Sequence, residues 1–238
     1  MDYKTQYQMY LSQASAALED ACAKFLPEES EVCRAARYSL LGGGKRIRAV
    51  LVFSVCDMLG GDPQTARAFS AAVEMLHCYS LIHDDLPCMD NDDLRRGRPS
   101  CHKAFGEATA MLAGDVLLTE AFEAIANAPA CPQACVQAAK ALGLGAGSRG
   151  MVYGQELDLK YEALAATEEQ LRLIHRNKTG ALINAASRWG QLPPVPTRPV
   201  PSTGSIRLRY WSGVPDRGRC AGCDQHAGTA GQAHWQRQ

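Results

Sequence analysis

The run HDDLPCMDNDDLRRGRP, at positions 83–99, combines five aspartates with three arginines. Asp84 and Asp85 end a stretch whose apolar residues recur at helical spacing. Pro87 then interrupts regular helical hydrogen bonding, and Asp90 follows after a short turn. Three carboxylates in this arrangement can face one point, where they repel one another unless a cation neutralises them. The pattern therefore favours Mg²⁺, which one or two carboxylates usually hold together with substrate phosphates.

Arg95 and Arg96 follow the aspartates at once. Their guanidinium groups offer forked donors that match phosphate oxygens, so the whole run is consistent with a metal-bridged diphosphate. An acidic run alone is more often a solvated loop with balancing arginines, and other segments must decide between the two interpretations.

A second basic segment lies earlier in the chain, in GGGKRIR at positions 42–48. It puts a glycine turn ahead of Lys45, Arg46 and Arg48 at the start of a predicted helix, where backbone N–H groups also favour an anion. His77 lies seven residues before Asp84, on roughly the same helical face, although a lone histidine on an apolar helix is more often a core residue.

Two weaker signals lie further along the chain. GQELDL, at positions 154–159, places Gln155 and Asp158 on neighbouring helical positions. Lys178 and Thr179 fall inside another helical run. Neither pair specifies a function without the segments described above.

Helices must position all of these groups, because apolar residues recur at helical spacing almost throughout the first 190 residues and strand alternation is absent. The pattern predicts an all-α domain over residues 1–190. The predicted helical segments are 5–26, 31–41, 47–60, 65–85, 108–128, 133–147 and 167–190.

Composition narrows the class of protein. The 238 residues are 46% hydrophobic with a formal net charge of zero, which gives no indication of nucleic-acid binding. Neither an eighteen-residue apolar window nor a signal-peptide pattern is seen, so the sequence predicts a cytoplasmic protein without a stable membrane anchor. Most of the ten cysteines lie inside apolar helical patterns and are interpreted as packing residues, among them Cys22, Cys33, Cys56 and Cys78.

The motifs GGGKRIR, HCYSLIHDDLPCMDNDDLRRGRPSCHKAFG, AMLAGDVLL, GQELDL and KTGAL occur in this order. Together they resemble the trans-prenyl diphosphate synthases, and most of all the bacterial farnesyl diphosphate synthases, or geranyltranstransferases. The resemblance covers about residues 1–190, and DDxxxxD followed by LRRGRP is far more specific than an acidic pair. It implies an isoprenoid-synthase-type helical bundle with a central cavity, and a homodimer.

The resemblance also implies a role for each candidate residue. Mg²⁺ and the diphosphate of the allylic substrate would be held by Asp84, Asp85, Asp90 and Arg95. Isopentenyl diphosphate would be bound by Lys45, Arg48, His77 and Arg96. The departing diphosphate and the allylic cation would be steadied by Lys178 and Thr179, in a cavity lined by Gln155 and Asp158. The implied reaction is loss of diphosphate from the allylic carbon, attack by the double bond of isopentenyl diphosphate, and loss of a proton.

Product length is implied by the residues ahead of the aspartates. The fifth residue before Asp84 is Tyr79, and the small Ser80 follows it. In the family these positions form the floor under the growing chain, so a ring there favours a farnesyl over a geranylgeranyl product. The two extra residues inside DDLPCMD are the form found in bacterial farnesyl synthases.

The last part of the sequence departs from the family. From Pro193 onward the chain lacks Glu, Lys, Phe, Met and Asn and carries six of the twelve prolines. The family's second metal motif, FQIxDDxLD, cannot be read there. Residues 211–238 can be back-translated with permitted codons into a DNA sequence. When that sequence is read one base later, it can encode GLAFQIADDVLDVISTPEQLGKPIGSD. We interpret residues 191–238 as an irregular, frameshifted tail in place of the family's C-terminal helices, although a disordered extension is the simpler interpretation.

Three alternatives to an active synthase follow. The chain can be a noncatalytic remnant that keeps only the first diphosphate site. The tail can be a zinc module built on CAGC with His226 and His234, although a frameshifted tail produces such spacings by accident. A class I terpene cyclase would share the aspartate motif, but GGGKRIR and LRRGRP indicate an isopentenyl diphosphate site that a cyclase would not need.

Overall fold

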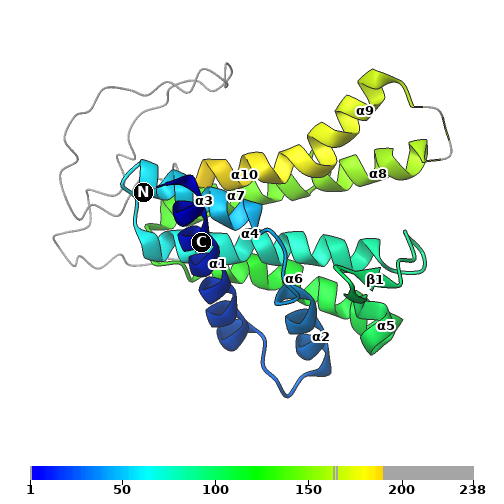
Figure 1. Ribbon diagram of the computed structural model, residues 1–238, viewed down its shortest axis with the longest axis horizontal. Helices are drawn as coiled ribbons and strands as arrows, with labels where there is room; N and C mark the ends of the chain where they lie inside the picture. Colours follow the sequence, from blue (N-terminus) through cyan, green and yellow to red (C-terminus); the bar gives the residue numbers. More distant parts are fainter. Residues whose placement is uncertain (1, 163, 165, 190–238) are drawn as a thin grey trace, which may run out of the picture. The chain divides into compact units, whose positions relative to one another are not determined.

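A computed structural model describes residues 2–162, 164 and 166–189. The interpretations of residues 191–238 as a frameshifted tail or a zinc module lie outside these residues. The described part of the chain is helical except for one short hairpin (Figure 1). Its elements are α1 (Tyr3–Phe25), α2 (Glu31–Leu40), α3 (Ile47–Met58), α4 (Pro63–Asp84), β1 (Leu94–Arg95), β2 (Arg98–Pro99), α5 (Cys101–Phe105), α6 (Glu107–Ala126), α7 (Pro132–Ala146), α8 (Met151–Tyr161), α9 (Glu168–Ile174), the π-helix η1 (His175–Gly180) and α10 (Ala181–Trp189).

The predicted helix starts are confirmed at the atomic level. Asp62 precedes Pro63 as the N-cap of α4, and its carboxylate accepts from the Thr65 amide at 2.8 Å. Thr167 caps α9 in a reciprocal capping box with Gln170. These contacts satisfy backbone donors that the first turn of a helix leaves without a partner.

The glycine turn between α2 and α3 separates the two helices as predicted. Gly43 and Gly44 have φ values of 83° and 121°, in a region that residues with a Cβ rarely adopt. Arg46, the N-cap of α3, is also left-handed at φ 47°. The chain therefore turns sharply just before the helix that carries Arg48.

The sequence predicted no strand, and this expectation is wrong for the arginine segment. Leu94–Arg95 and Arg98–Pro99 pair as antiparallel strands. Arg96 and Gly97 form the turn between them with φ values of 54° and 77°, as a type I′ hairpin requires. Strands of two residues are too short to show any alternation, but the turn fixes Arg95 and Arg96 in defined positions.

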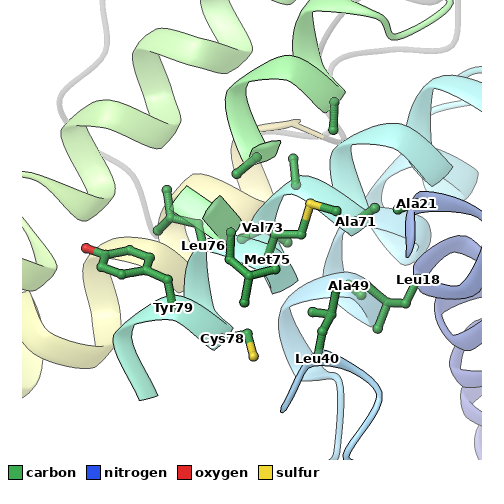
Figure 2. Close-up of a cluster of buried hydrophobic side chains, with 14 of the residues drawn as sticks. Leu18, Ala21, Leu40, Ala49, Ala71, Val73, Met75, Leu76, Cys78 and Tyr79 are labelled. Atoms are coloured by element: carbon green, nitrogen blue, oxygen red, sulfur yellow. The ribbon is translucent and has the colours of Figure 1, made fainter. Parts of the chain in front are cut away.

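The core is built around α4, which has over half of its residues buried and packs against α1, α3 and α6. Figure 1 shows α4 and α6 side by side. Figure 2 shows the buried cluster around α4, with Leu18 of α1 toward one end and Tyr79 at the other. The interpretation of Cys22, Cys33, Cys56 and Cys78 as packing residues is confirmed, because all four are buried and free.

The last described helices pack onto this core and onto α8. Trp189 of α10 lies 5.7 Å from the ring of Phe69, and its indole donates to the Ala138 carbonyl at 3.1 Å. The preceding segment, predicted as regular helix, is π-helical over His175–Gly180 and lies against α8. No helix of the described part of the chain is both long and apolar enough to cross a membrane.

Candidate active site

A cavity of about 590 Å³ opens between α4, α8 and η1, with contributions from α3, α6 and the loop after α4. The structure brings eight of the predicted site residues to its wall: Arg48, His77, Tyr79, Ser80, Asp84, Gln155, Lys178 and Thr179. The remaining predicted residues do not line this cavity, and they are Lys45, Asp85, Asp90, Arg95, Arg96 and Asp158.

The aspartate loop folds back on itself, as the proline predicted. The Asp90 amide donates to the Asp84 carbonyl at 2.9 Å, and Asn91 adopts a left-handed conformation at φ 52°. Burial raises the pKa of Asp84 to about 6, and the nearby charges of Asp90 and Asp85 add to the increase against the opposing effect of Lys178 and Arg95. Asp84 is therefore a half-buried carboxylate short of positive charge, which is the condition that a bound cation relieves.

Asp85 has a different environment from Asp84. It is 2% exposed, and its two carboxylate oxygens accept from Arg95 Nε at 2.9 and 3.1 Å. Arg95 also contacts Asp92 at 3.3 Å. The buried carboxylate thus fixes the guanidinium group of Arg95 on this side of the loop.

Within residues 2–162, 164 and 166–189, no group of three or more His, Cys, Asp or Glu side chains is arranged to hold a metal ion. The donor set nevertheless fits Mg²⁺ as it occurs in phosphate-transferring sites, where one or two carboxylates suffice and substrate oxygens complete the shell. Asp84, with Asp90 beside it, is the candidate pair, because Asp85 is already engaged by Arg95.

Arg48 and His77 line the same cavity and form its cationic wall, in which Arg48 carries the charge. Arg48 Nε and His77 Nδ1 are buried and lack a hydrogen-bond partner among the described residues. Burial lowers the pKa of His77 to about 3, and the positive charges of Arg48, Arg96, Arg46 and Arg95 lower it further. Unsatisfied donors inside a positive field fit an anionic ligand, which would satisfy the donors and offset the charge.

The two basic motifs meet at the glycine turn. The Arg96 guanidinium donates to the Gly43 carbonyl and lies so close to Gly44 that a Cβ there would come within 2.8 Å of it. Lys45 is exposed, and its carbonyl accepts from the Tyr7 hydroxyl at 2.8 Å. The structure thus joins GGGKRIR to LRRGRP, while the Lys45 side chain does not line the cavity.

Lys178 of η1, which also lines the cavity, is held by a residue of α8. Its ammonium group donates to Asp158 at 2.6 Å, which explains why Asp158 lies at the edge of the cavity and not in its lining. Gln155 contributes a buried side-chain amide, neither of whose polar atoms has a partner in the described structure. Gly154 lets η1 approach closely, because a Cβ there would overlap the backbone of Lys178.

The apolar lining was not predicted beyond Tyr79 and Ser80. It includes Leu86, Met89, Met111, Met151, Val152 and Leu159. Tyr79 packs edge-on against His83 at 5.7 Å, and His83 Nε2 is 2.9 Å from the Met111 carbonyl. A Cβ at Gly114 would overlap that imidazole, so the glycine inside AMLAGDVLL was a signal of this close approach.

Comparison with known proteins agrees with this fold and site. A geranyltransferase structure from Legionella pneumophila superposes with a TM-score of 0.76 at 42% identity, over 79% of this chain and 68% of that chain. An FPP/GFPP synthase structure from Zymomonas mobilis has a TM-score of 0.75 at 36% identity, over 79% of this chain and 70% of that one. The fold is therefore the predicted isoprenoid-synthase type of helical fold.

The family follows from sequence. The polyprenyl synthetase family model matches residues 29–193, and the chain belongs to this family. It is 49% identical over 168 residues to the farnesyl diphosphate synthase of Micrococcus luteus, covering 71% of this chain and 58% of that protein. It is 44% identical over 192 residues to geranylgeranyl pyrophosphate synthase 3 of Arabidopsis thaliana, covering 77% and 53%. The chain thus spans about half the length of the curated relatives that it matches.

Proposed function

We propose that this chain derives from a prenyltransferase that condenses isopentenyl diphosphate with dimethylallyl or geranyl diphosphate to give farnesyl diphosphate. The observation that carries the proposal is one cavity with two different walls. The carboxylate of Asp84 lines one part of this cavity, and Arg48 and His77, each with a buried polar atom that lacks a partner in the described structure, line another. Two diphosphates, one of them bridged by a metal, would complement both walls.

The allylic diphosphate belongs at the aspartate wall. Mg²⁺ held there by Asp84 and Asp90 would supply charge that neutralises the departing diphosphate. Arg95, fixed by Asp85 and close enough to Asp84 to lower its pKa, would add positive charge near the same group, and Lys178 lines the cavity from η1. These preorganised cations act where negative charge develops, in a cavity whose apolar lining limits water.

Isopentenyl diphosphate belongs at the cationic wall. Arg48 carries the charge there, Arg96 adds positive charge from the adjoining glycine turn without lining the cavity, and His77 remains neutral because its pKa is lowered to about 3. Lys45 is exposed at the glycine turn and does not line the cavity. The two walls then present the double bond of one substrate to the allylic carbon of the other.

The farnesyl product is the finer part of the proposal, because the relatives include geranylgeranyl as well as farnesyl synthases. It is supported by Tyr79, which is 9% exposed, lines the cavity and is braced by His83. A braced ring resists displacement by a growing chain better than a free one. Homodimer formation and a cytoplasmic location stay predictions of the sequence.

A noncatalytic remnant is the second candidate, because FQIxDDxLD is missing from the printed sequence. We propose that a frameshift between the KTGAL helix and Trp211 removed this motif. The test compares the chain as given with a version whose frame is restored, using radiolabelled isopentenyl diphosphate, geranyl diphosphate and Mg²⁺. We expect condensation from the restored protein and little from the given chain.

Comparable turnover by both proteins would show that the tail is no defect. Absence of condensation by the restored protein would contradict the proposed reaction itself. The DNA sequence around codons 188–211 decides the origin of the shift independently of activity.

A further inference from the structure

A buried ion pair lies next to the cationic wall, and neither of its members lines the cavity described above. Arg46 is 8% exposed and Glu74 is 2% exposed, and Arg46 Nη1 donates to Glu74 Oε2 at 3.2 Å. Arg46 lies two residues before Arg48, and Glu74 lies one helical turn before His77. The pair therefore connects the two elements that carry the wall.

Glu74 also holds the start of α3. Its other oxygen, Oε1, accepts from the Ala49 amide at 3.2 Å, in the first turn of a helix whose N-cap residue makes no side-chain cap hydrogen bond. The glutamate thus acts as a cap supplied from α4. Because Arg48 lies in the same first turn, this contact sets where its side chain leaves α3.

Arg46 ties the pair to α2 and to the glycine turn. Its Nη2 donates to the Leu40 carbonyl at 2.5 Å, at the last residue of α2. Its backbone is left-handed at φ 47°, a conformation that a residue with a side chain keeps only where its surroundings enforce it. Glu74 and Leu40 supply that enforcement, and the resulting turn orients Lys45 and Arg48.

The three basic residues of GGGKRIR therefore differ in role. Arg46 uses both terminal nitrogens inside the protein, whereas Arg48 lines the cavity with an unsatisfied Nε. Glu74 is also the buried anion of this region: its charge opposes the lowering of the pKa of Arg48 and of Arg96 that burial causes. The same carboxylate supports the geometry and the charge of the wall.

We propose that Glu74, acting through Arg46 and the first turn of α3, is a positioning residue for the isopentenyl diphosphate half of the site. This inference rests on the proposed function. Glu74 does not touch the ligand: it holds Arg48 at the angle that the diphosphate requires. The allylic half, built on the aspartate loop and η1, does not depend on it.

The test measures two affinities by titration calorimetry on the full chain: isopentenyl diphosphate alone, and geranyl diphosphate with MgCl₂. Glu74→Gln keeps the length of the side chain and removes its charge. The double variant Arg46→Met/Glu74→Leu replaces the pair by apolar side chains, a change that buried pairs often tolerate without loss of stability. Leu142→Ala is the control, because Leu142 is fully buried in α7 and does not line the cavity.

We expect both Glu74 variants to bind isopentenyl diphosphate at least about tenfold more weakly, while geranyl diphosphate with Mg²⁺ stays within about twofold. Leu142→Ala should lower the melting temperature and leave both affinities unchanged. Unchanged isopentenyl diphosphate affinity in the double variant would overturn the positioning role. Equal weakening of both ligands would also overturn it, because a general loss of structure affects both halves.

Failure of the unaltered chain to bind either ligand would contradict the proposed function, a result distinct from the two above. If Glu74→Gln unfolds, its thermal melting curve will show it, and the double variant then decides the question.

Discussion

Replacing Gly154 with alanine tests how the protein holds Lys178. A Cβ at this position would lie 2.5 Å from Lys178 Cα and 2.7 Å from the Asn177 carbonyl carbon, and still closer to the Lys178 amide nitrogen. Ordinary contact begins at 3.4 Å, and all three atoms belong to the backbone, so α8 and η1 must separate by about 1 Å or more. Overpacking of this kind costs about 1–3 kcal/mol, whereas a helical Gly→Ala change returns about 1 kcal/mol.

The expected net result is a loss of about 0–2 kcal/mol in the free energy of unfolding, which lowers the Tm by about 2–4 °C per kcal/mol in a chain of this size. The shift also moves Lys178 relative to the aspartates, and a misplacement of about 1 Å can reduce a reaction rate on the order of 100-fold. Thermal unfolding followed by circular dichroism measures the first effect. Condensation by the frame-restored enzyme measures the second.

Gly143→Ala is the matched control, because Gly143 is also helical and a Cβ there meets no atom within 4 Å. It should raise stability by about 0.5–1 kcal/mol, as a glycine in a helix interior is replaced. If Gly154→Ala is as stable and as active as Gly143→Ala, the close packing of α8 on η1 does not hold Lys178, and the reasoning fails.

Three further predictions concern the two walls and the floor of the cavity. His77 stays neutral in the folded state, with its pKa lowered from 6.5 to about 3, so the unfolded state takes up the proton first and stability falls as the pH drops below 6.5. When the pH is lowered from 6.5 to 5, the free energy of unfolding measured with urea should fall by about 1.5 kcal/mol more for the unaltered chain than for His77→Gln. Equal decreases would contradict a buried, neutral His77. Asp84→Asn should abolish Mg²⁺-dependent diphosphate binding in calorimetry and raise the Tm of the metal-free chain, because a half-buried charge with carboxylate neighbours is removed; unchanged affinity would reject the metal assignment. Tyr79→Ala in the frame-restored enzyme should lengthen the product, and chromatography showing the same chain length would place the floor elsewhere.

The helices could be predicted from sequence because each buries one continuous stripe, and that stripe leaves a period in the residue pattern. The caps at Asp62 and Thr167 could be predicted for a similar reason, since the side chain and the amide it caps are three residues apart. The convergence of Arg48, His77, Asp84 and Lys178 on one cavity followed from the order of the motifs and not from periodicity.

Other features depend on partners distant in sequence. Arg46 and Arg48 look alike in GGGKRIR. In the structure Arg46 is buried against Glu74, which lies 28 residues further along the chain, whereas Arg48 lines the cavity. Asp85 looks equivalent to Asp84 in the sequence, but in the structure its carboxylate accepts hydrogen bonds from Arg95. The choice between such roles is made by packing, which local sequence does not encode.

The π-helix at His175–Gly180 has a consequence for how this site can change over time. A π-turn holds one residue more than an α-turn, so deleting a single residue there would restore an unbroken α-helix without loss of hydrogen bonding. The wider turn takes up the extra residue, so after the deletion Ile174 on one side and Leu182 and Trp189 on the other could keep their buried positions. The extra residue therefore acts locally, and deleting it should change the placement of Lys178 and Thr179 at the cavity more than the packing of the flanking helices.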